Sequence, residues 1–192
     1  IKSIDKLLST NGTIIFEEPY LGAMYKKTSY DQIYDEHIYM FSLSSIKKIY
    51  DLFGFELIDA IPQITHGGSM RYILKRKGIA KKSQRLLKLL KLERIKKINK
   101  FSACLLFKNK VMRSKYKLKK KIIEIKKKGF KICGYGATSK STTILNFCKI
   151  NKEMIDCIFD TTKEKIGKFT PGTHIPILDY KQFENSNYKY VF

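Results

Sequence analysis

The sequence predicts an α/β protein in which two regions of alternating helices and strands are joined by a long basic helical stretch. Short β-branched or aromatic runs alternate with amphipathic runs over residues 1–78, and a strand, glycine turn, helix and strand pattern fills residues 130–192. Between them, residues 79–129 carry apolar side chains at helical spacing among many lysines. We therefore expect domains at 1–78 and 130–192 and a helical linker at 79–129.

The first region begins with a helix and a strand. Residues 4–8 predict a short helix that stops at an Asn-Gly turn, and the β-branched run at 13–16 predicts the strand. A polar, aromatic-rich loop follows this strand. Open α/β sheets place ligands at the carboxyl ends of their strands, so we expect ligand chemistry in this loop.

The rest of the first region predicts a helix and a hairpin. Residues 46–53 form an amphipathic run that Ser42 or Ser44 could cap. Two strand-like runs, 55–61 and 71–75, flank a turn with two adjacent glycines. Glycine permits the tight backbone of a hairpin connection, which is the simplest interpretation of the pair.

Residues 30–37, with the sequence YDQIYDEH, concentrate groups that suit acid/base chemistry. His37 can exchange a proton near neutral pH, and the adjacent Glu36 and Tyr34 are of the types that orient such an imidazole. From this motif alone, a polar loop whose histidine only makes local hydrogen bonds is an equal alternative.

The third region predicts a β-α-β unit. A strand at 130–133, a glycine turn, a helix at about 141–148 and a strand at 154–159 follow one another, and Asp160 ends the last strand. An acid there could bind a ribose, although a turn-forming role is the preferred interpretation. The run 170–176 is rich in turn-forming residues and is interpreted as a structural loop, which could border a nucleotide site.

The glycine turn of this unit suits an anion. Gly134 and Gly136 match the first two glycines of a dinucleotide fingerprint, but Ser139 replaces the third, which makes the pattern weak for NAD. The amides at the start of the following helix, beside Thr138, Ser139 and Lys140, suit a pyrophosphate.

The net charge of +22 is concentrated in the middle of the chain. Residues 79–130 hold 20 lysines and arginines against two acids, Glu93 and Glu124. Apolar residues recur there at helical spacing, and lysine exceeds arginine, the better residue for bidentate phosphate contacts. We therefore expect an amphipathic helical linker and regard nucleic acid as an unlikely partner. Binding to nucleic acid or to an anionic membrane remains a minor alternative.

Cysteine use and hydropathy favour a cytoplasmic protein. Cys104, Cys133, Cys148 and Cys157 show no C-x-x-C spacing, which predicts unpaired cysteines in a reducing compartment and no metal site in this chain. No apolar run is long enough for a transmembrane segment. The sequence leaves the oligomeric state open.

Five motifs in order resemble those of sugar C-methyltransferases, the nucleotide-diphosphate-hexose 3-C-methyltransferases of deoxysugar pathways. The motifs are EPYLG at 18–22, YDQIYDEH at 30–37, THGGSMR at 65–71, GYGATSK at 134–140 and TPGTHIP at 170–176. By this resemblance, residues 1–78 are the C-terminal third of a class I, Rossmann-like methyltransferase domain. Residues 130–192 are a truncated, Rossmann-like C-methyltransferase C-terminal domain.

The resemblance implies that a methyl group passes from S-adenosylmethionine to C3 of a nucleotide-linked 4-keto-deoxysugar. His37 would remove the C3 proton, which the adjacent ketone acidifies, and the resulting enolate would attack the methyl group. Glu36 would orient His37 or tune its basicity. Tyr34 would hydrogen-bond the substrate or the oxyanion that develops on the ketone oxygen.

The resemblance also suggests residues that bind the nucleotide-sugar. Tyr20 and Tyr30 could line a sugar pocket or could pack at a domain boundary, and His66 and Ser69 could reach the substrate from the glycine turn. The glycine turn with Gly134, Gly136, Thr138, Ser139 and Lys140 is assigned to the phosphates of the substrate, because the family's C-terminal domain carries no redox cofactor.

Two parts of the family are not visible in this sequence. Upstream of residue 13 there is neither a glycine-rich turn nor an acid for the adenosyl ribose, so we expect the S-adenosylmethionine site mostly outside this chain. Zinc would belong to an N-terminal cysteine-rich module of the family that is also missing. The chain is therefore expected to be a fragment that is inactive alone. A non-catalytic nucleotide-sugar or dinucleotide binding module is the alternative.

Overall fold

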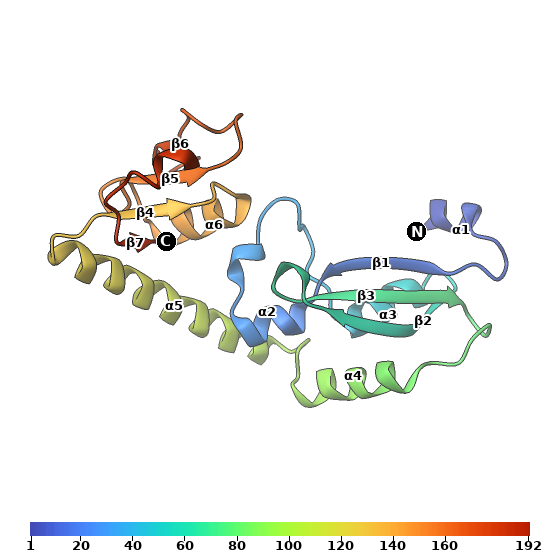
Figure 1. Cartoon of the computed structure of the whole chain (residues 1–192). Coiled ribbons are helices and arrows are strands. Elements are labelled where there is room, and N and C mark those ends of the chain that lie inside the picture. Colours follow the sequence, from blue (N-terminus) through green and yellow to red (C-terminus); the bar gives the residue numbers. More distant parts are fainter. The chain divides into compact units, whose positions relative to one another are not determined.

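The computed structural model describes all 192 residues and divides into two compact units. Unit 1 comprises Ile1–Ser29 and His37–Lys108, and unit 2 comprises Tyr30–Glu36 and Asn109–Phe192. Each unit combines a sheet with helices (Figure 1), so the prediction of a mixed α/β protein is confirmed.

The sheet of unit 1 has three strands, β1 (Ile14–Pro19), β2 (Phe55–Gln63) and β3 (Ser69–Arg76). Strand β3 lies between the other two and is antiparallel to both. The short 3-10 turn Thr65–Gly67 joins β2 to β3, which confirms the predicted hairpin. In the register of β1 with β3, Glu17 lies opposite Arg71.

Four helices belong to unit 1: α1 (Lys2–Leu7), α2 (Leu21–Lys27), α3 (Leu43–Asp51) and α4 (Gln84–Ile95). Helices α3 and α4 contact β2 and each other (Figure 1). Alternate strand residues point to these helices because side chains alternate across a strand. The buried core they form includes Leu43 and Ile46 of α3, Leu57, Tyr72 and Leu74 of the sheet, and Leu86 of α4.

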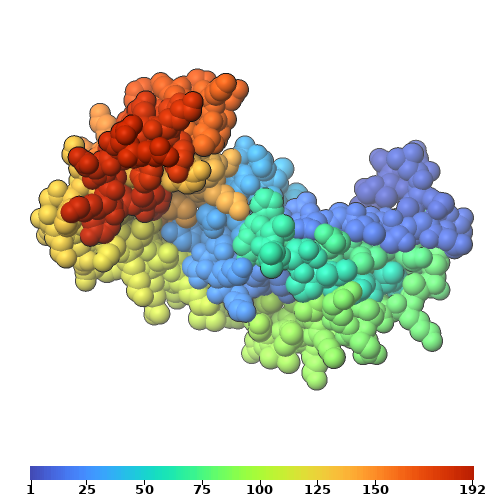
Figure 2. Space-filling view, in the orientation of Figure 1, coloured from blue at the N-terminus to red at the C-terminus, as the bar shows by residue number.

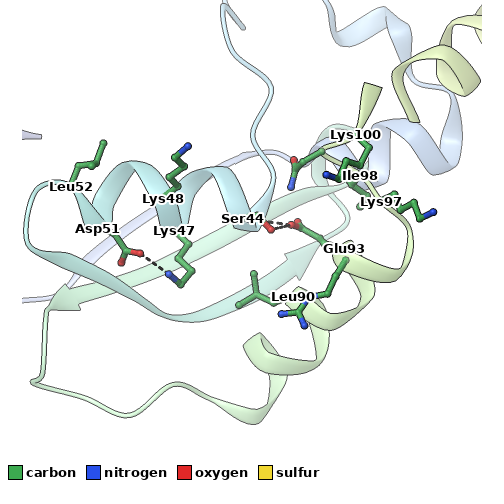
Figure 3. Close-up of a pocket in the computed structure, with 12 residues that line it drawn as sticks. Ser44, Lys47, Lys48, Asp51, Leu52, Leu90, Glu93, Lys97, Ile98 and Lys100 are labelled. Carbon is green, nitrogen blue, oxygen red and sulfur yellow. Dashed lines mark hydrogen bonds and ion pairs between the residues drawn. The ribbon is translucent and has the colours of Figure 1, made fainter. Parts of the chain in front are cut away.

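The N-terminus of α3 is closed by side chains from two parts of the chain. Ser42 is the capping residue: its hydroxyl accepts from the Ser45 N–H, and the Ser45 hydroxyl reaches back to Ser42. The Glu93 carboxylate of α4 accepts from the Leu43 N–H at 2.7 Å. It also accepts from the Ser44 N–H at 3.0 Å and from the Ser44 hydroxyl at 2.6 Å (Figure 3). Glu93 is only 2% exposed, so its carboxylate oxygens find their hydrogen-bond donors within the protein, in these groups and in the Tyr20 hydroxyl.

Unit 2 is built on a four-stranded sheet of parallel strands in the order β6-β5-β4-β7. Its core includes Cys133, Cys157 and Phe159. The elements of the unit are η1 (Tyr30–Gln32), the part of α5 (Phe101–Lys127) after Lys108, β4 (Ile132–Tyr135), α6 (Ser139–Cys148), β5 (Cys157–Asp160), β6 (Ile177–Asp179), η3 (Tyr180–Gln182) and β7 (Tyr190–Val191).

Some element boundaries differ from those predicted. Strand β5 begins at Cys157 rather than at residue 154, because the N–H groups of Met154 and Ile155 bond to the Asn151 carbonyl in a turn. Helix α3 begins at Leu43, three residues before the predicted start, where the Ser42 cap and Glu93 complete its first turn. Three cysteines are buried, and Cys104 is exposed.

The basic middle of the chain forms helices α4 and α5. The residues of α5, coloured yellow-green in Figure 2, lie at the surface, where Met112 and Tyr116 are 50% and 69% exposed. Val111 and Ile122 on the other side of the helix are buried. The helix is therefore amphipathic, with most of its lysines in solvent.

We expect the substitution Glu93→Gln to lower the free energy of unfolding of unit 1 by about 2 kcal/mol, because an amide NH₂ would face buried N–H donors that lose their acceptor. Urea titration followed by circular dichroism measures this change. Glu124→Gln, on the exposed face of α5, is the control and should change stability by less than about 0.5 kcal/mol. Equal effects of the two substitutions would contradict the role assigned to Glu93.

Candidate functional site

His37 lies against a carboxylate of the first strand. Its Nδ1 atom is 3.9 Å from Oε2 of Glu18, and the His37 side chain is 18% exposed. Glu18 is fixed by β1, where it pairs in register with Met70. At 3.9 Å the contact is too long for a hydrogen bond, so it places a carboxylate beside the imidazole without fixing its tautomer.

Tyr34 and Glu36 form a second pair, within unit 2. The Tyr34 phenol is hydrogen-bonded to the Glu36 carboxylate. Partial burial and the nearby Glu36 charge raise the pKa of Tyr34 above its usual value. Tyr34 is therefore a protonated phenol at neutral pH and can act as a hydrogen-bond donor.

The glycine turn of unit 1 is held by Glu17. Its Oε1 atom accepts from the hydroxyls of Thr65 and Ser69, and Arg71 lies 3.2 Å from its Oε2. Hydrogen bonds from Ser69 and Thr65, followed by Arg71, lower the pKa of Glu17. Ser69 is 2% exposed and is engaged in this network, whereas His66 at the tip of the turn is exposed and has a left-handed backbone (φ 49°).

The two candidate tyrosines make contacts inside the protein. The Tyr20 hydroxyl donates to Glu93 at 2.9 Å, and burial and the Glu93 charge raise the pKa of Tyr20. Tyr30 is 7% exposed, and its hydroxyl lies 3.5 Å from the Cys148 Sγ atom. Both phenols are therefore held by the protein itself.

The glycine turn of unit 2 leads into α6. Gly136 has φ 87°, a conformation that favours glycine, and a Cβ atom on Gly134 would lie 2.9 Å from the Ile158 side chain. Thr138 caps α6, and its hydroxyl accepts from the Ser141 N–H. The backbone conformation at Gly136 and the close approach of Ile158 at Gly134 therefore each favour glycine.

Most amides of this turn already have acceptors. The N–H of Gly136 bonds to the Phe159 carbonyl, that of Ala137 to the Asp160 carboxylate at 2.7 Å, and that of Thr138 to the Ser141 hydroxyl. The N–H groups of Ser139 and Lys140, in the first turn of α6, are left for an anion.

Asp160 closes the turn from the end of β5. Its carboxylate accepts from the N–H groups of Ala137 and Thr162, both at 2.7 Å, and lies 3.7 Å from the Lys165 ammonium. These donors lower the pKa of Asp160 although its burial opposes the shift. The side chain is 5% exposed and serves the turn, which fits the preferred interpretation of this acid.

A cavity of about 900 Å³ lies beside α6 in unit 2, and we call it the α6 cavity. Hydroxyl and amide groups line it, with three aromatic rings, two lysines and two acids, Asp35 and Glu164. Phe147 is 39% exposed and Phe169 is 61% exposed. The lining residues used below are Tyr34, Asp35, Thr138, Ser139, Asn146, Phe147, Lys165, Lys168 and Phe169.

A second cavity, of about 580 Å³, lies between α3 and α4 in unit 1 (Figure 3). Glu93 and Ser44 are bonded to each other in its wall, and Lys47 is paired with Asp51 at 2.6 Å. None of the residues that the sequence suggested for catalysis or substrate binding lines this cavity. It is therefore separate from the candidate site.

The structure brings together some of the predicted site residues. Tyr34, Thr138 and Ser139 line one cavity, whereas His37, Tyr20, His66 and Ser69 belong to unit 1. No group of three or more His, Cys, Asp or Glu side chains is arranged to hold a metal ion. No helix is long and apolar enough to span a bilayer.

Sequence reasoning missed several residues of the site. Glu18 was not connected to His37, because a contact across 19 positions leaves no local pattern. Lys165, Lys168 and Phe169 were also missed. The signal was available: they follow Asp160 in a short basic and aromatic segment after the carboxyl end of a strand.

Acidification should loosen the turn Thr65–Gly67. The pKa of Glu17 is depressed in the folded protein, so its hydrogen bonds are present above its usual value of 4.5 and are lost as the pH falls through the lower, folded value. Amide NMR signals of residues 65–69 should therefore titrate below pH 4.5. In Glu17→Gln the same signals should be independent of pH over this range, and an unchanged titration would contradict the assignment.

Two comparisons place this chain among known proteins. Residues 64–192 match the model of the C-methyltransferase C-terminal domain. The C-methyltransferase NovU of Streptomyces niveus is 28% identical over 184 residues, which is 95% of this chain and 44% of NovU. The chain thus spans less than half the length of this relative. By the family match, which covers most of its residues, the chain belongs to the family that carries the C-methyltransferase C-terminal domain.

Proposed function

We propose that this chain is the acceptor-binding and proton-abstracting part of an S-adenosylmethionine-dependent C-methyltransferase, and that its substrate is a nucleotide-diphosphate 4-keto-deoxysugar. The similarity to NovU along 95% of the chain is the observation that carries the proposal. The motif at residues 30–37 falls within the matched length and holds the only histidine that lies against a carboxylate.

The layout proposed for the chain follows the same reasoning. The parallel strands β4, β5 and β6 and the helix α6 after β4 support a Rossmann-like C-terminal domain for residues 130–192. The antiparallel sheet over residues 14–76 supports the end of a methyltransferase domain. Helices α4 and α5 would then be the basic linker between the two.

His37 would act as the general base. Its imidazole would take the proton from C3 of the acceptor, with the Glu18 carboxylate 3.9 Å from Nδ1 favouring the protonated ring. The electron pair of the C3–H bond moves into an enolate, and negative charge develops on the ketone oxygen. The Tyr34 hydroxyl, which donates to Glu36 in the ligand-free chain, would turn from Glu36 to that oxygen and donate its single hydrogen bond there.

S-adenosylmethionine would supply the electrophilic methyl group that the enolate carbon attacks. The one glycine turn between a strand and a helix in this chain is closed by Asp160, so its residues do not fit an adenosyl ribose. We therefore assign the donor site mostly to residues outside this chain, and no step of the mechanism here depends on it. Zinc likewise has no proposed site in the chain.

The α6 cavity would bind the nucleotide part of the acceptor. The exposed ring of Phe169 suits stacking against a base. Lys165, Lys168 and the free N–H groups of Ser139 and Lys140 suit the diphosphate. Gly134, Gly136 and Thr138 shape the turn that presents those amides.

The remaining candidates keep secondary roles in the proposal. His66 is exposed at the turn tip and could reach the sugar, whereas Ser69, Tyr20 and Tyr30 would act by holding the site's backbone. A non-catalytic nucleotide-sugar or dinucleotide module is the competing function. The Asp160 carboxylate already accepts two N–H groups and is therefore not free to bind a ribose. This disfavours a module that binds a dinucleotide.

His37→Ala in the full-length protein should slow the wash-in of solvent deuterium at C3 of dTDP-4-keto-6-deoxyglucose by about 100-fold or more, because general-base catalysis is lost. Proton NMR in D₂O measures this step without requiring methyl transfer. His174→Ala, in an exposed loop of unit 2, is the control and should exchange normally. A normal rate of deuterium exchange in His37→Ala would contradict the assignment of His37 as the general base.

Phe169→Ala should weaken binding of thymidine diphosphate to this chain by about tenfold, as expected for loss of one stacking ring. Calorimetry measures the dissociation constant, with Phe101→Ala on α5 as the control, since Phe101 is also exposed (77%, against 61% for Phe169) and lies outside the α6 cavity. Lys168→Ala should reduce both the affinity and its dependence on salt. Tighter binding of NAD than of thymidine diphosphate would favour the dinucleotide module instead.

A further inference from the structure

The segment that leads into the catalytic motif is built into unit 2. Residues Tyr30–Glu36 pack with Asn109–Phe192, although the chain on both sides of them belongs to unit 1. The short turn η1 at the start of this segment contacts α6. A surface loop with no anchor would expose its side chains, but here two of the first three are almost fully buried.

Tyr30 is the main anchor of this segment. Its ring lies 5.4 Å from the ring of Phe147, and its hydroxyl lies 3.5 Å from Sγ of Cys148, the last residue of α6. Lys115 of α5 lies over the Phe147 ring at 4.5 Å. Burial, followed by the contact with Cys148, raises the pKa of Tyr30 to about 12, so the phenol stays neutral.

Gln32 is the second anchor. It is 2% exposed, and its Oε1 atom is buried without a hydrogen-bond partner. A buried amide oxygen without a partner is unfavourable by about 1–3 kcal/mol, so the packing around it must outweigh this penalty. The packing of Tyr30 and Gln32 therefore holds the turn η1 in place although the Gln32 oxygen lacks a hydrogen bond.

The chain changes character directly after Gln32. Ile33 is 51% exposed, and the side chains of Ile33, Tyr34 and Asp35 line the α6 cavity together with Thr138 and Asn146. The anchored turn thus delivers these three residues to the wall of the cavity. A ligand in the α6 cavity would contact the segment that carries Tyr34.

We infer that Tyr30 is a positioning residue, which fixes Tyr34 and Asp35 in the wall of the α6 cavity, so that a nucleotide bound there orders the catalytic segment. The ligand part of this inference rests on the proposed function, whereas the anchoring part does not. Occupancy of the acceptor site and the geometry of Tyr34 are then coupled, because the same segment forms the cavity wall and carries the phenol. The acceptor would prepare the segment before methyl transfer.

Hydrogen exchange in the 192-residue chain tests the anchor first. Tyr30→Leu should speed amide exchange at residues 33–36 by about tenfold, because local opening no longer breaks the contacts with α6. Tyr188→Leu is the matched control, since it also removes a phenol that lies 3.5 Å from a cysteine Sγ atom in unit 2. Unchanged exchange at 33–36 in Tyr30→Leu, or equal acceleration in the control, would overturn the anchor.

Tyr30→Phe separates the ring from the hydroxyl. It keeps the contact with Phe147 and removes the one with Cys148, so it should restore most of the protection that Tyr30→Leu loses. This rescue also guards against a general folding defect. Failure of Tyr30→Phe to restore protection, in a chain that melts normally, would show that the ring contact with Phe147 is not what positions the segment.

Thymidine diphosphate, added at saturation, tests the coupling. We expect slower exchange at residues 33–36 as well as around residues 137–147, and no slowing at 33–36 in Tyr30→Leu. Slowing around 137–147 alone would overturn the coupling and leave the proposed acceptor site intact. If the nucleotide slows exchange in neither region, the proposed acceptor site and the coupling are both wrong. The anchoring role of Tyr30 is decided by the exchange measured without ligand.

Discussion

The buried carboxylate of Glu93 is the interaction on which unit 1 depends. An isolated helix N-terminus presents unpaired N–H groups and a partial positive charge, and a carboxylate satisfies both. Glu93 reaches α3 from α4, 50 residues later, and accepts at the same time from Tyr20 at the start of α2. One side chain therefore connects helices α2, α3 and α4 through hydrogen bonds near the end of β1. This explains an acid within the most basic part of the chain, where composition alone would favour lysine.

The sequence predicted elements whose signal is local. The strand before Glu17, the helix after Ser42, the hairpin around Gly67 and the unit with α6 all appeared, because periodicity, caps and glycine turns act within a few residues. The apolar and aromatic run at 188–192 did indicate a final strand, and β7 lies within it. Strand β6 was not predicted, since its three residues carry little periodicity and pair with a strand that is distant in the sequence. The role of Glu93 was missed for the same reason. The groups that stabilise the Glu93 carboxylate, such as the Leu43 N–H and the Tyr20 hydroxyl, lie far from it along the chain.

The candidate site shows the same limit in a sharper form. Residues 34–37 form one motif in the sequence, but Tyr34 and Glu36 pack with unit 2, while His37 begins the return to unit 1 and lies against Glu18. The sequence paired Glu36 with His37 because they are neighbours. In the structure the Tyr34 phenol contacts the Glu36 carboxylate, and the His37 imidazole lies near the Glu18 carboxylate. A peptide motif thus identified the chemical groups, and only the packing could assign their partners.

The hydrogen bonds of the α6 turn also determine what kind of ligand the C-terminal unit can hold. In a turn whose amides are free, a pyrophosphate replaces water on several N–H groups and needs few cations. Here Asp160 already supplies the negative charge at that position and occupies the Ala137 N–H, so only two amides at the start of α6 remain. In the proposed site, binding energy for a diphosphate would then come from Lys168, from Lys165, which is also 3.7 Å from Asp160, and from stacking on Phe169. Under the proposed function, nucleotide binding at such a site would depend strongly on salt, and stacking on one ring would suit a ligand with a single base.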